Sequence, residues 1–348
     1  MANLFLYAGA TARRPLFIVR GAAGEPLLAG VDRSGRLRLV QRQGAAAWHD
    51  ADLTEALPGG GTSHCADVRQ APDGTIAVAL SVRNAAGAST LHCGTGLPAG
   101  HDMAGWAETL RHLPAAPGLP SNAGVKRLKF GLLQAGAPPL LLIETAAAQG
   151  VQNWYCNAAA PGTLRALRLP PGAAHAIGSF RQPGVWSLHA EGKASTLRFT
   201  PLRDPFGWGV DLGYRDLPPH TRSVLLAPGT MPNVPDLYVA GEGIVVYRGG
   251  NTLPQPVAPV AGARLLWSHA RDGAEYLACA DGEGALWMIA RPRRGAWSAP
   301  VRLTRRRAVL AVAGQFIYAA AVEEGNLEVQ RFTMDGRLYD SETAARGW

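Results

Sequence analysis

Two stretches of this sequence begin at positions 28 and 277, 249 residues apart, and repeat one pattern. They align without a gap as far as Trp48 and Trp297. The identical pairs include Leu28 and Leu277, Ala29 and Ala278, Asp32 and Asp281, Gly35 and Gly284, Leu37 and Leu286, and Arg42 and Arg291. Each copy reads as an apolar strand, an Asp/Gly turn, a second apolar strand, a Gly-containing turn and a tryptophan that opens another strand. This order predicts an antiparallel meander with tight turns.

Weaker copies of the strand–turn–strand pattern fill the rest of the chain. Their turns lie at residues 84–87, 149–150, 191–192, 241–243 and 324–326. The third strand of each unit is anchored by one residue: Leu37, Leu91, Trp154, Leu197, Val245, Leu286 and Leu327. The anchors are roughly 48 residues apart on average, which is a period typical of propeller repeats.

The sequence therefore predicts an all-β fold: a single β-propeller of about seven four-stranded blades, with residues 1–348 as one domain. The segment Leu4–Tyr7 is expected to close the ring as an outer strand of the last blade, residues 316–332. No stretch sustains the 3.6-residue period of a helix, so almost no helix is expected. A β-sandwich with insertions is the alternative fold.

Composition agrees with many short strands around a large core. Gly (42) and Pro (26) are dispersed along the chain, 47% of the residues are apolar and 17% are charged.

The four cysteines, Cys65, Cys93, Cys156 and Cys279, form no CxxC pair, which predicts free thiols and a reducing compartment. We find no signal peptide and no transmembrane span. These features predict a cytoplasmic protein, or one exported without a cleavable signal peptide of the usual kind.

Motifs for catalysis are scarce. The sequence has no GxSxG, HExxH, P-loop or dinucleotide fingerprint, so no cofactor is expected. His64, His175 and His269 lie near expected inner strands and would either converge on a metal or face a wet channel, and their spacing favours the second reading. The turn at Asp281 resembles half of a sialidase Asp box, but its Asp is one residue too early. These observations argue against an enzyme and leave a carbohydrate hydrolase or lyase as a third possibility.

Four tryptophans, Trp48, Trp106, Trp208 and Trp297, recur at the expected start of an outermost strand. In one interpretation, each indole fills the gap between adjacent blades. In the other, the indole faces stack on sugar rings, which suits a side chain with a flat apolar surface and an N–H donor. The pattern favours the structural role and keeps these four residues as candidate ligand contacts.

The turn Gly295-Ala-Trp297, with a looser copy at Ala46-Ala-Trp48, resembles the blade pattern of propeller lectins of the tectonin and bacterial fucose-binding types. The resemblance covers the architecture of the whole chain, and its motifs are not specific. It implies a recognition protein with a glycan as ligand. A protein–protein scaffold or assembly subunit is the close rival, because propellers serve both functions.

Two basic clusters remain, at residues 291–294 and at Arg305, Arg306 and Arg307. The repeat register places the first between the third and fourth strands of a blade, and the second in the link to the next blade. These connections lie on opposite faces of a propeller, whereas nucleic acid needs one contiguous basic stripe. The formal net charge of +8 therefore does not predict nucleic-acid binding. Arg305–Arg307 remain candidates for contact with an anion or an acidic partner.

Overall fold

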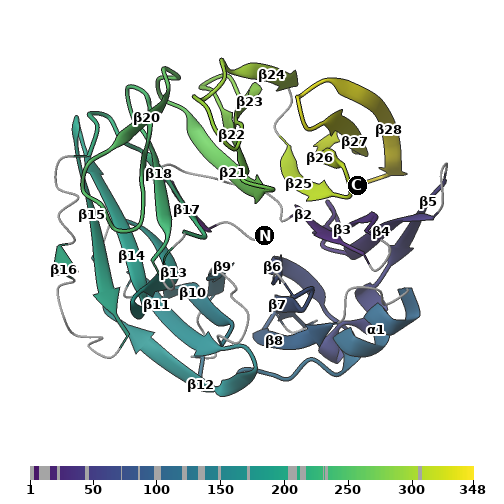
Figure 1. The fold of residues 1–348 in the computed structure, drawn as a ribbon. Helices are drawn as coiled ribbons and strands as arrows, with labels where there is room; N and C mark the ends of the chain where they lie inside the picture. Colours follow the sequence, from purple (N-terminus) through teal and green to yellow (C-terminus); the bar gives the residue numbers. More distant parts are fainter. Residues whose placement is uncertain are drawn as a thin grey trace.

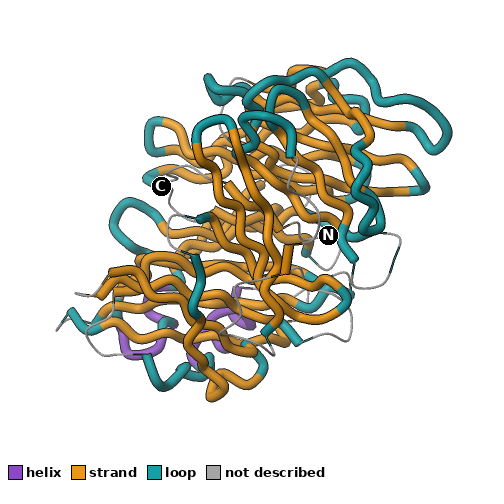
Figure 2. Tube along the Cα trace, turned by 90° about the vertical axis from the view of Figure 1, so that its left-hand side faces the viewer, coloured by secondary structure: helices purple, strands orange, loops and turns teal. Residues whose placement is uncertain are grey.

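The computed structural model describes residues 4–7, 16–21, 24–43, 47–71, 73–84, 87–97, 103–119, 124–131, 138–147, 150–170, 173–202, 210–211, 217–229, 231, 234–304 and 308–348. Its strands form seven small antiparallel sheets that radiate from a common centre (Figure 1). The molecule is therefore a seven-bladed β-propeller, as the repeat predicts. In the side view, strands make up most of the tube and the helical segments are confined to one corner (Figure 2).

The blades follow one another in chain order, and we number them I to VII. Blade I contains β2 (Leu16–Arg20), β3 (Pro26–Val31), β4 (Leu37–Gln43) and β5 (Ala47–Asp52). Blade II contains β6 (Thr62–Gln70), β7 (Ile76–Arg83) and β8 (Ser89–Leu97). Blade III contains β9 (Gly124–Phe130), β10 (Leu140–Ala147), β11 (Gly150–Asn157) and β12 (Ala160–Leu167). Blade IV contains β13 (Ala174–Phe180), β14 (Gln182–Glu191), β15 (Ala194–Pro201) and β16 (Val210–Asp211).

The second half of the ring has three blades. Blade V contains β1 (Leu4–Tyr7), β17 (Ser223–Ala227), β18 (Asp236–Ala240), β19 (Ile244–Tyr247) and β20 (Gln255–Ala258). Blade VI contains β21 (Arg264–Arg271), β22 (Ala274–Ala280), β23 (Leu286–Arg291) and β24 (Val301–Thr304). Blade VII contains β25 (Val309–Ala313), β26 (Phe316–Glu323), β27 (Asn326–Thr333) and β28 (Leu338–Arg346).

The repeat register of the sequence is confirmed in local detail. Six of the seven anchor residues lie in the third strand of their blade, from Leu37 in β4 to Leu327 in β27. Val245 lies in β19, which is the fourth strand of blade V because β1 is added inside β17. The two best copies also build the same turn. Asp32 Oδ1 accepts hydrogen bonds from the backbone N–H groups of residues 34 and 36, at 2.8 and 3.0 Å. Asp281 Oδ1 accepts them from residues 283 and 285, at 3.0 and 2.9 Å. The Asp and Gly that both copies share therefore cap the backbone of the turn and hold each hairpin in register.

The prediction for the N-terminal strand is wrong. Strand β1 pairs with β17, Leu4 opposite Leu226 and Tyr7 opposite Ser223, and is the innermost strand of blade V. Blade VII instead completes itself with β28, which follows β27 in the sequence. The free edge of any inner strand offers the same backbone donors and acceptors, so the sequence of a short apolar strand does not reveal which edge it joins.

The expectation of almost no helix is corrected in blade II. After β8 the chain forms α1 (Met103–Arg111), and the sheet of this blade has three strands among the described residues. Two short 3-10 turns, η1 (Thr54–Ala56) and η2 (Pro58–Gly60), precede β6. Trp106, Leu110 and Leu113 follow a spacing of four and three residues, which places them on one face of the helix and its following turn. None of the helices in the described part of the chain is long and apolar enough to cross a membrane.

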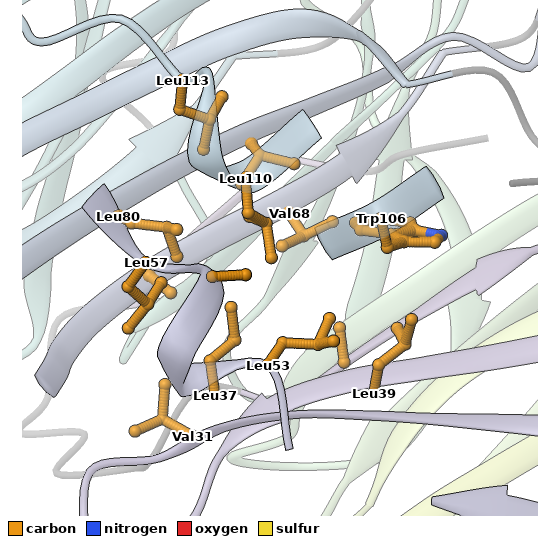
Figure 3. Packing of buried hydrophobic residues seen from close by; sticks show 14 of the residues in the cluster. Val31, Leu37, Leu39, Leu53, Leu57, Val68, Leu80, Trp106, Leu110 and Leu113 are labelled. Atoms are coloured by element: carbon orange, nitrogen blue, oxygen red, sulfur yellow. The ribbon is translucent and has the colours of Figure 1, made fainter. Parts of the chain in front are cut away.

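The core is divided among the gaps between neighbouring blades. Buried side chains from two adjacent sheets face each other in each gap, because alternate residues of a strand point to opposite faces. Between blades I and II the helix completes the packing: Trp106 and Leu110 point toward Leu39, Leu53 and Val68 (Figure 3).

The seam between blades VII and I is where the ring closes. The guanidinium of Arg38 in β4 donates hydrogen bonds to the carbonyl oxygens of Gly347 at 2.8 Å and Arg346 at 3.0 Å. It also forms an ion pair with Asp50 on its own blade and lies 4.9 Å from the ring centroid of Trp348. Trp348 is 2% exposed and packs among apolar residues of both blades. Side chains, rather than a strand exchanged between the two ends of the chain, therefore hold this seam.

All four cysteines are free in the structure, and three of them are buried. Burial raises the pKa of Cys65 to about 11 and that of Cys279 to about 12. The sulfur atoms of Cys93 and Cys156, from adjacent blades, are 4.0 Å apart, about twice the length of a disulfide bond.

We expect thiol titration of the unfolded, unreduced protein to find four thiols. The native protein should react at no more than one site, the partly exposed Cys65, because burial both shields a thiol and disfavours its reactive thiolate. A count of two in the unfolded protein would contradict this prediction and would identify a disulfide.

Candidate functional site

The structure places Trp48 and Trp297 at equivalent positions five blades apart. In blade I, Gln41 pairs with His49, the residue after Trp48. In blade VI, the N–H of Ser298, the residue after Trp297, donates to the carbonyl of Ala290 at 2.7 Å. Ala290 and Ser298 each lie 249 residues after their counterparts Gln41 and His49, which is the offset of the sequence repeat. Trp48 lies in β5, whereas Trp297 lies in the loop that leads to β24, so only Trp48 opens a regular outer strand.

An arginine lies over the indole in both blades. The guanidinium carbon of Arg42 is 5.6 Å from the ring centroid of Trp48, and that of Arg291 is 5.8 Å from Trp297. The hairpin register explains this, because Arg42 is directly opposite Trp48 in the strand pair. The identity of Arg42 and Arg291 in the repeat thus marks a cation–π pair, a role that sequence reasoning did not assign.

The other two candidate tryptophans do not join them. Trp106 lies on α1, not at the start of a strand, and only 3% of it is exposed. Its indole faces the core between blades I and II and has no face open to a ligand. Trp208 lies outside the described residues, as do Arg305, Arg306 and Arg307.

Trp297 belongs to a polar network at the seam between blades V and VI. We call Tyr238, Arg248, Glu275, Arg291 and Trp297 the Trp297 cluster. Tyr238 comes from β18, Arg248 directly follows β19, and Glu275 and Arg291 are partners in the pairing of β22 with β23. Trp297 meets Tyr238 edge-on, with ring centroids 6.2 Å apart. Two blades and five backbone segments are needed to assemble the cluster.

Glu275 is the centre of this network. Its Oε2 accepts a hydrogen bond from the Tyr238 hydroxyl at 3.0 Å and pairs with Arg248 Nη2 at 2.6 Å. Its Oε1 pairs with Arg291 Nη2 at 3.1 Å. Arg248 Nη1 in turn pairs with Asp236 Oδ2 at 2.9 Å. Burial, with the Glu275 charge acting in the same direction, raises the pKa of Tyr238 above its ordinary value, so the phenol is a fixed hydrogen-bond donor at neutral pH.

The Trp297 cluster is built firmly but remains open to a ligand. Tyr238 is buried, whereas the side chains of Arg248 and Arg291 are 22% and 28% exposed. Trp297 is half-buried, and both of its neighbours in sequence are exposed. No described residue accepts a hydrogen bond from its indole N–H. An arginine, a carboxylate and a half-open indole with a free donor are thus held within one seam.

The seam around Trp48 has the same parts in a closed arrangement. Glu342 on β28 of blade VII accepts hydrogen bonds from Trp48 Nε1 at 2.7 Å and Arg42 Nη2 at 2.9 Å. Arg331 Nη2 approaches the same carboxylate at 3.6 Å. The indole N–H of Trp48 is therefore used within the protein. Here the carboxylate comes from the preceding blade, whereas Glu275 belongs to the same blade as Trp297.

The three histidines do not converge on one point. His175 Nδ1 lies 2.9 Å from Ser187 Oγ, and its Nε2 lies 3.1 Å from the carbonyl of Pro170. His64 contacts Ser81, and His269 stacks on Trp267. Burial lowers the pKa of His175 and of His269 to about 4, so both imidazoles are neutral at physiological pH. Among the described residues, no group of three His, Cys, Asp or Glu side chains is arranged to hold a metal.

Comparisons with known proteins agree with this architecture. No protein-family model and no curated protein sequence matches the chain. The BP39L lectin from Burkholderia pseudomallei aligns over 96% of this chain and 99% of its own, at 14% identity and a TM-score of 0.56. The Aleuria aurantia lectin, in complex with Fucα1-6GlcNAc, aligns over 96% and 98% at 13% identity, with a TM-score of 0.42. The fold of this propeller thus resembles that of the BP39L lectin.

Peptidases also resemble the chain. A puromycin-hydrolysing peptidase from Mycobacterium tuberculosis aligns over 97% of this chain at 14% identity, with a TM-score of 0.52, and the alignment covers 53% of that peptidase. At these identities the likenesses establish the fold and leave the ligand open.

Proposed function

We propose that the protein is a non-catalytic recognition propeller that binds carbohydrate, with the Trp297 cluster as the sugar-binding site. The half-exposed indole of Trp297, whose N–H has no partner among the described residues, carries the proposal. A sugar ring presents an apolar face that stacks on an indole, and hydroxyl groups around it that hydrogen-bond to arginine and carboxylate. Arg291 lies over this indole and pairs with Glu275, and Tyr238 and Arg248 hold the Glu275 carboxylate in place.

The sequence suggests two roles for the repeated tryptophans, packing between blades and stacking on a sugar. We propose that Trp48 has the first role and Trp297 the second. Trp48 is tied to Glu342 and packs at the seam that closes the ring, which supports a structural role. Trp297 lies in a loop, and its indole N–H has no partner among the described residues, which supports a role in binding. We therefore propose one sugar site of this type between blades V and VI, and do not extend it to Trp106.

Replacing Trp297 with alanine is expected to weaken glycan binding at least about tenfold, because stacking and apolar contact together contribute about 1.5 kcal/mol or more. The free energy of unfolding should fall by no more than about 2 kcal/mol, since the indole is only partly buried. A glycan array identifies the ligand, isothermal titration gives the affinity, and urea denaturation gives the stability.

Trp48→Ala is the matched control, because Trp48 has the equivalent position and a cation–π partner of its own. It should retain glycan affinity while losing more stability than Trp297→Ala. Trp297→Phe should recover part of the affinity through its ring face. If Trp297→Ala binds every array glycan as well as the unmodified protein, the site is not at Trp297.

The rival function, a scaffold for a protein partner, is favoured by one observation on blade VII. Leu338 and Tyr339 are neighbours at the start of β28. Leu338 is 56% exposed and Tyr339 is 61% exposed. Tyr339 lies against Phe316, with centroids 4.8 Å apart, and under the guanidinium of Arg331 at 5.0 Å. Exposed aromatic and aliphatic side chains beside an arginine are typical of protein interfaces. A stoichiometric protein partner whose binding is lost in Tyr339→Ser, and a blank glycan array, would favour this function.

A further inference from the structure

A run of exposed arginines borders the Trp297 cluster and has no counterpart at Trp48. Between Arg291 and Trp297 the loop contains Arg293 and Arg294, and all residues from 292 to 296 are exposed. The equivalent positions in blade I, by the 249-residue register, are Gly44 and Ala45. The two hairpins therefore share the Arg–Trp pair and differ in charge at the adjoining loop.

The stem of Arg293 packs against the turn that precedes Glu275. Its side chain lies so close to Gly273, in the turn between β21 and β22, that a Cβ at Gly273 would be 2.7 Å from Arg293 Cγ. Gly273 also has φ of +79°, a conformation that favours glycine. Glu275 follows two residues later. The stem of Arg293 is therefore packed beside the cluster, which fixes the region that its guanidinium can reach.

The charges of this region leave two positive groups in excess. Arg248 and Arg291 are matched by Asp236 and Glu275. In the neighbouring turn, Arg271 approaches Asp272 at 3.4 Å. Neither Arg293 nor Arg294 has an ion pair with any residue in the described ranges. A neutral sugar would leave both guanidinium groups without a partner, whereas a carboxylate or sulfate would receive charge-assisted hydrogen bonds from them.

We propose that the ligand of the Trp297 cluster is an anionic glycan, one that carries uronic acid or sulfate groups. Its ring stacks on Trp297 beside Arg291 and Glu275, and its anionic group is bound by Arg293 and Arg294. This inference rests on the proposed function and adds the charge of the ligand. It also gives Trp48 and Trp297 different roles, because residues 43–47, between Arg42 and Trp48, include no charged residue.

The test compares three probes: a sulfated heparin oligosaccharide, a hyaluronan oligosaccharide that carries carboxylates alone, and a neutral chitooligosaccharide. Isothermal titration measures each against the unmodified protein, Trp297→Ala and the double variant Arg293→Ala/Arg294→Ala. The matched control is Arg33→Ala/Arg346→Ala, which removes two exposed arginines from blades I and VII. It changes the net charge by the same amount, so general attraction between a basic protein and a polyanion is subtracted.

We expect at least one anionic probe to bind at least tenfold more tightly than the neutral probe. Arg293→Ala/Arg294→Ala should lower that affinity at least tenfold and the control less than twofold. The affinity should also fall between 50 and 300 mM salt, because exposed charges are screened. Binding of heparin alone would identify sulfate as the recognised group, and binding of hyaluronan would identify carboxylate.

Four outcomes would overturn the inference, and they distinguish its failure from a failure of the proposed function. If the neutral probe binds as tightly as the anionic ones and depends on Trp297 but not on Arg293 and Arg294, the protein is a lectin without a charge preference. If no glycan binds, the proposed function fails as well. Equal loss in the control variant, or equal binding of duplex DNA of the same length, would show unspecific attraction of polyanions and would also contradict the inference.

Discussion

Replacing Trp106 with alanine is expected to lower the free energy of unfolding by about 3–5 kcal/mol. The indole is 3% exposed and packs in the gap between blades I and II, against Leu39, Leu53 and Val68 (Figure 3). A small apolar cavity already borders this side chain, so the space left by the indole would enlarge an existing void. Urea denaturation followed by tryptophan fluorescence and circular dichroism measures the loss.

Glu108→Ala is the control for this change, because Glu108 lies on the exposed side of the same helix. It should change the stability by less than about 0.5 kcal/mol, as for other surface substitutions. Trp106→Phe should recover part of the loss. If Trp106→Ala and Glu108→Ala unfold at the same urea concentration, the helix does not seal the gap between blades I and II.

Replacing Arg38 with alanine is expected to cost about 3 kcal/mol, because it breaks the seam where the ring closes. The change removes two charge-assisted hydrogen bonds to the carbonyls of Gly347 and Arg346, the ion pair with Asp50 and the contact with Trp348. Side chains carry this seam without an exchanged strand, so no other element compensates locally. Thermal and urea unfolding report the loss, and limited proteolysis near the C-terminal residues should become faster.

Arg346→Ala is the control for this change, because it removes a positive charge near the same seam without removing the hydrogen bond between Arg38 and the Arg346 carbonyl. Its side chain is exposed, while only its backbone carbonyl meets Arg38. This variant should unfold within about 0.5 kcal/mol of the unmodified protein. Arg38→Lys should recover less than half of the loss, because an ammonium group lacks the forked geometry that reaches two carbonyls and a carboxylate together. Equal stability of Arg38→Ala and Arg346→Ala would show that the seam is held by apolar packing alone.

The sequence was least informative where the fold departs from its own repeat. The spacing of Trp106, Leu110 and Leu113 was a readable helical signal, but it extends over only two turns and is easily missed in a chain of strands. The pairing of β1 with β17 had no signal of this kind. A four-residue apolar strand satisfies the edge of any blade equally well, and the choice depends on where the chain lies in space.

Much of the polar network at Trp297 also required the folded chain. Arg291 and Trp297 are close in sequence, and their hairpin register makes them neighbours by local rules. Tyr238 and Arg248 come from another blade, and nothing in their own sequence indicates that they meet Glu275. Contacts between blades depend on how wedge-shaped sheets pack around the axis, which is a property of the whole ring.

The sequence by itself determined the repeating unit, the all-β class and the equivalence of Trp48 and Trp297. Capped turns and alternating apolar residues are short-range features, and a hairpin obeys the same hydrogen-bond register wherever it occurs. Only the tertiary structure decided that Trp48 is tied to Glu342 while Trp297 keeps its N–H free of described partners. Two copies of one repeat thus form two different sites, because each seam receives its carboxylate from a different strand.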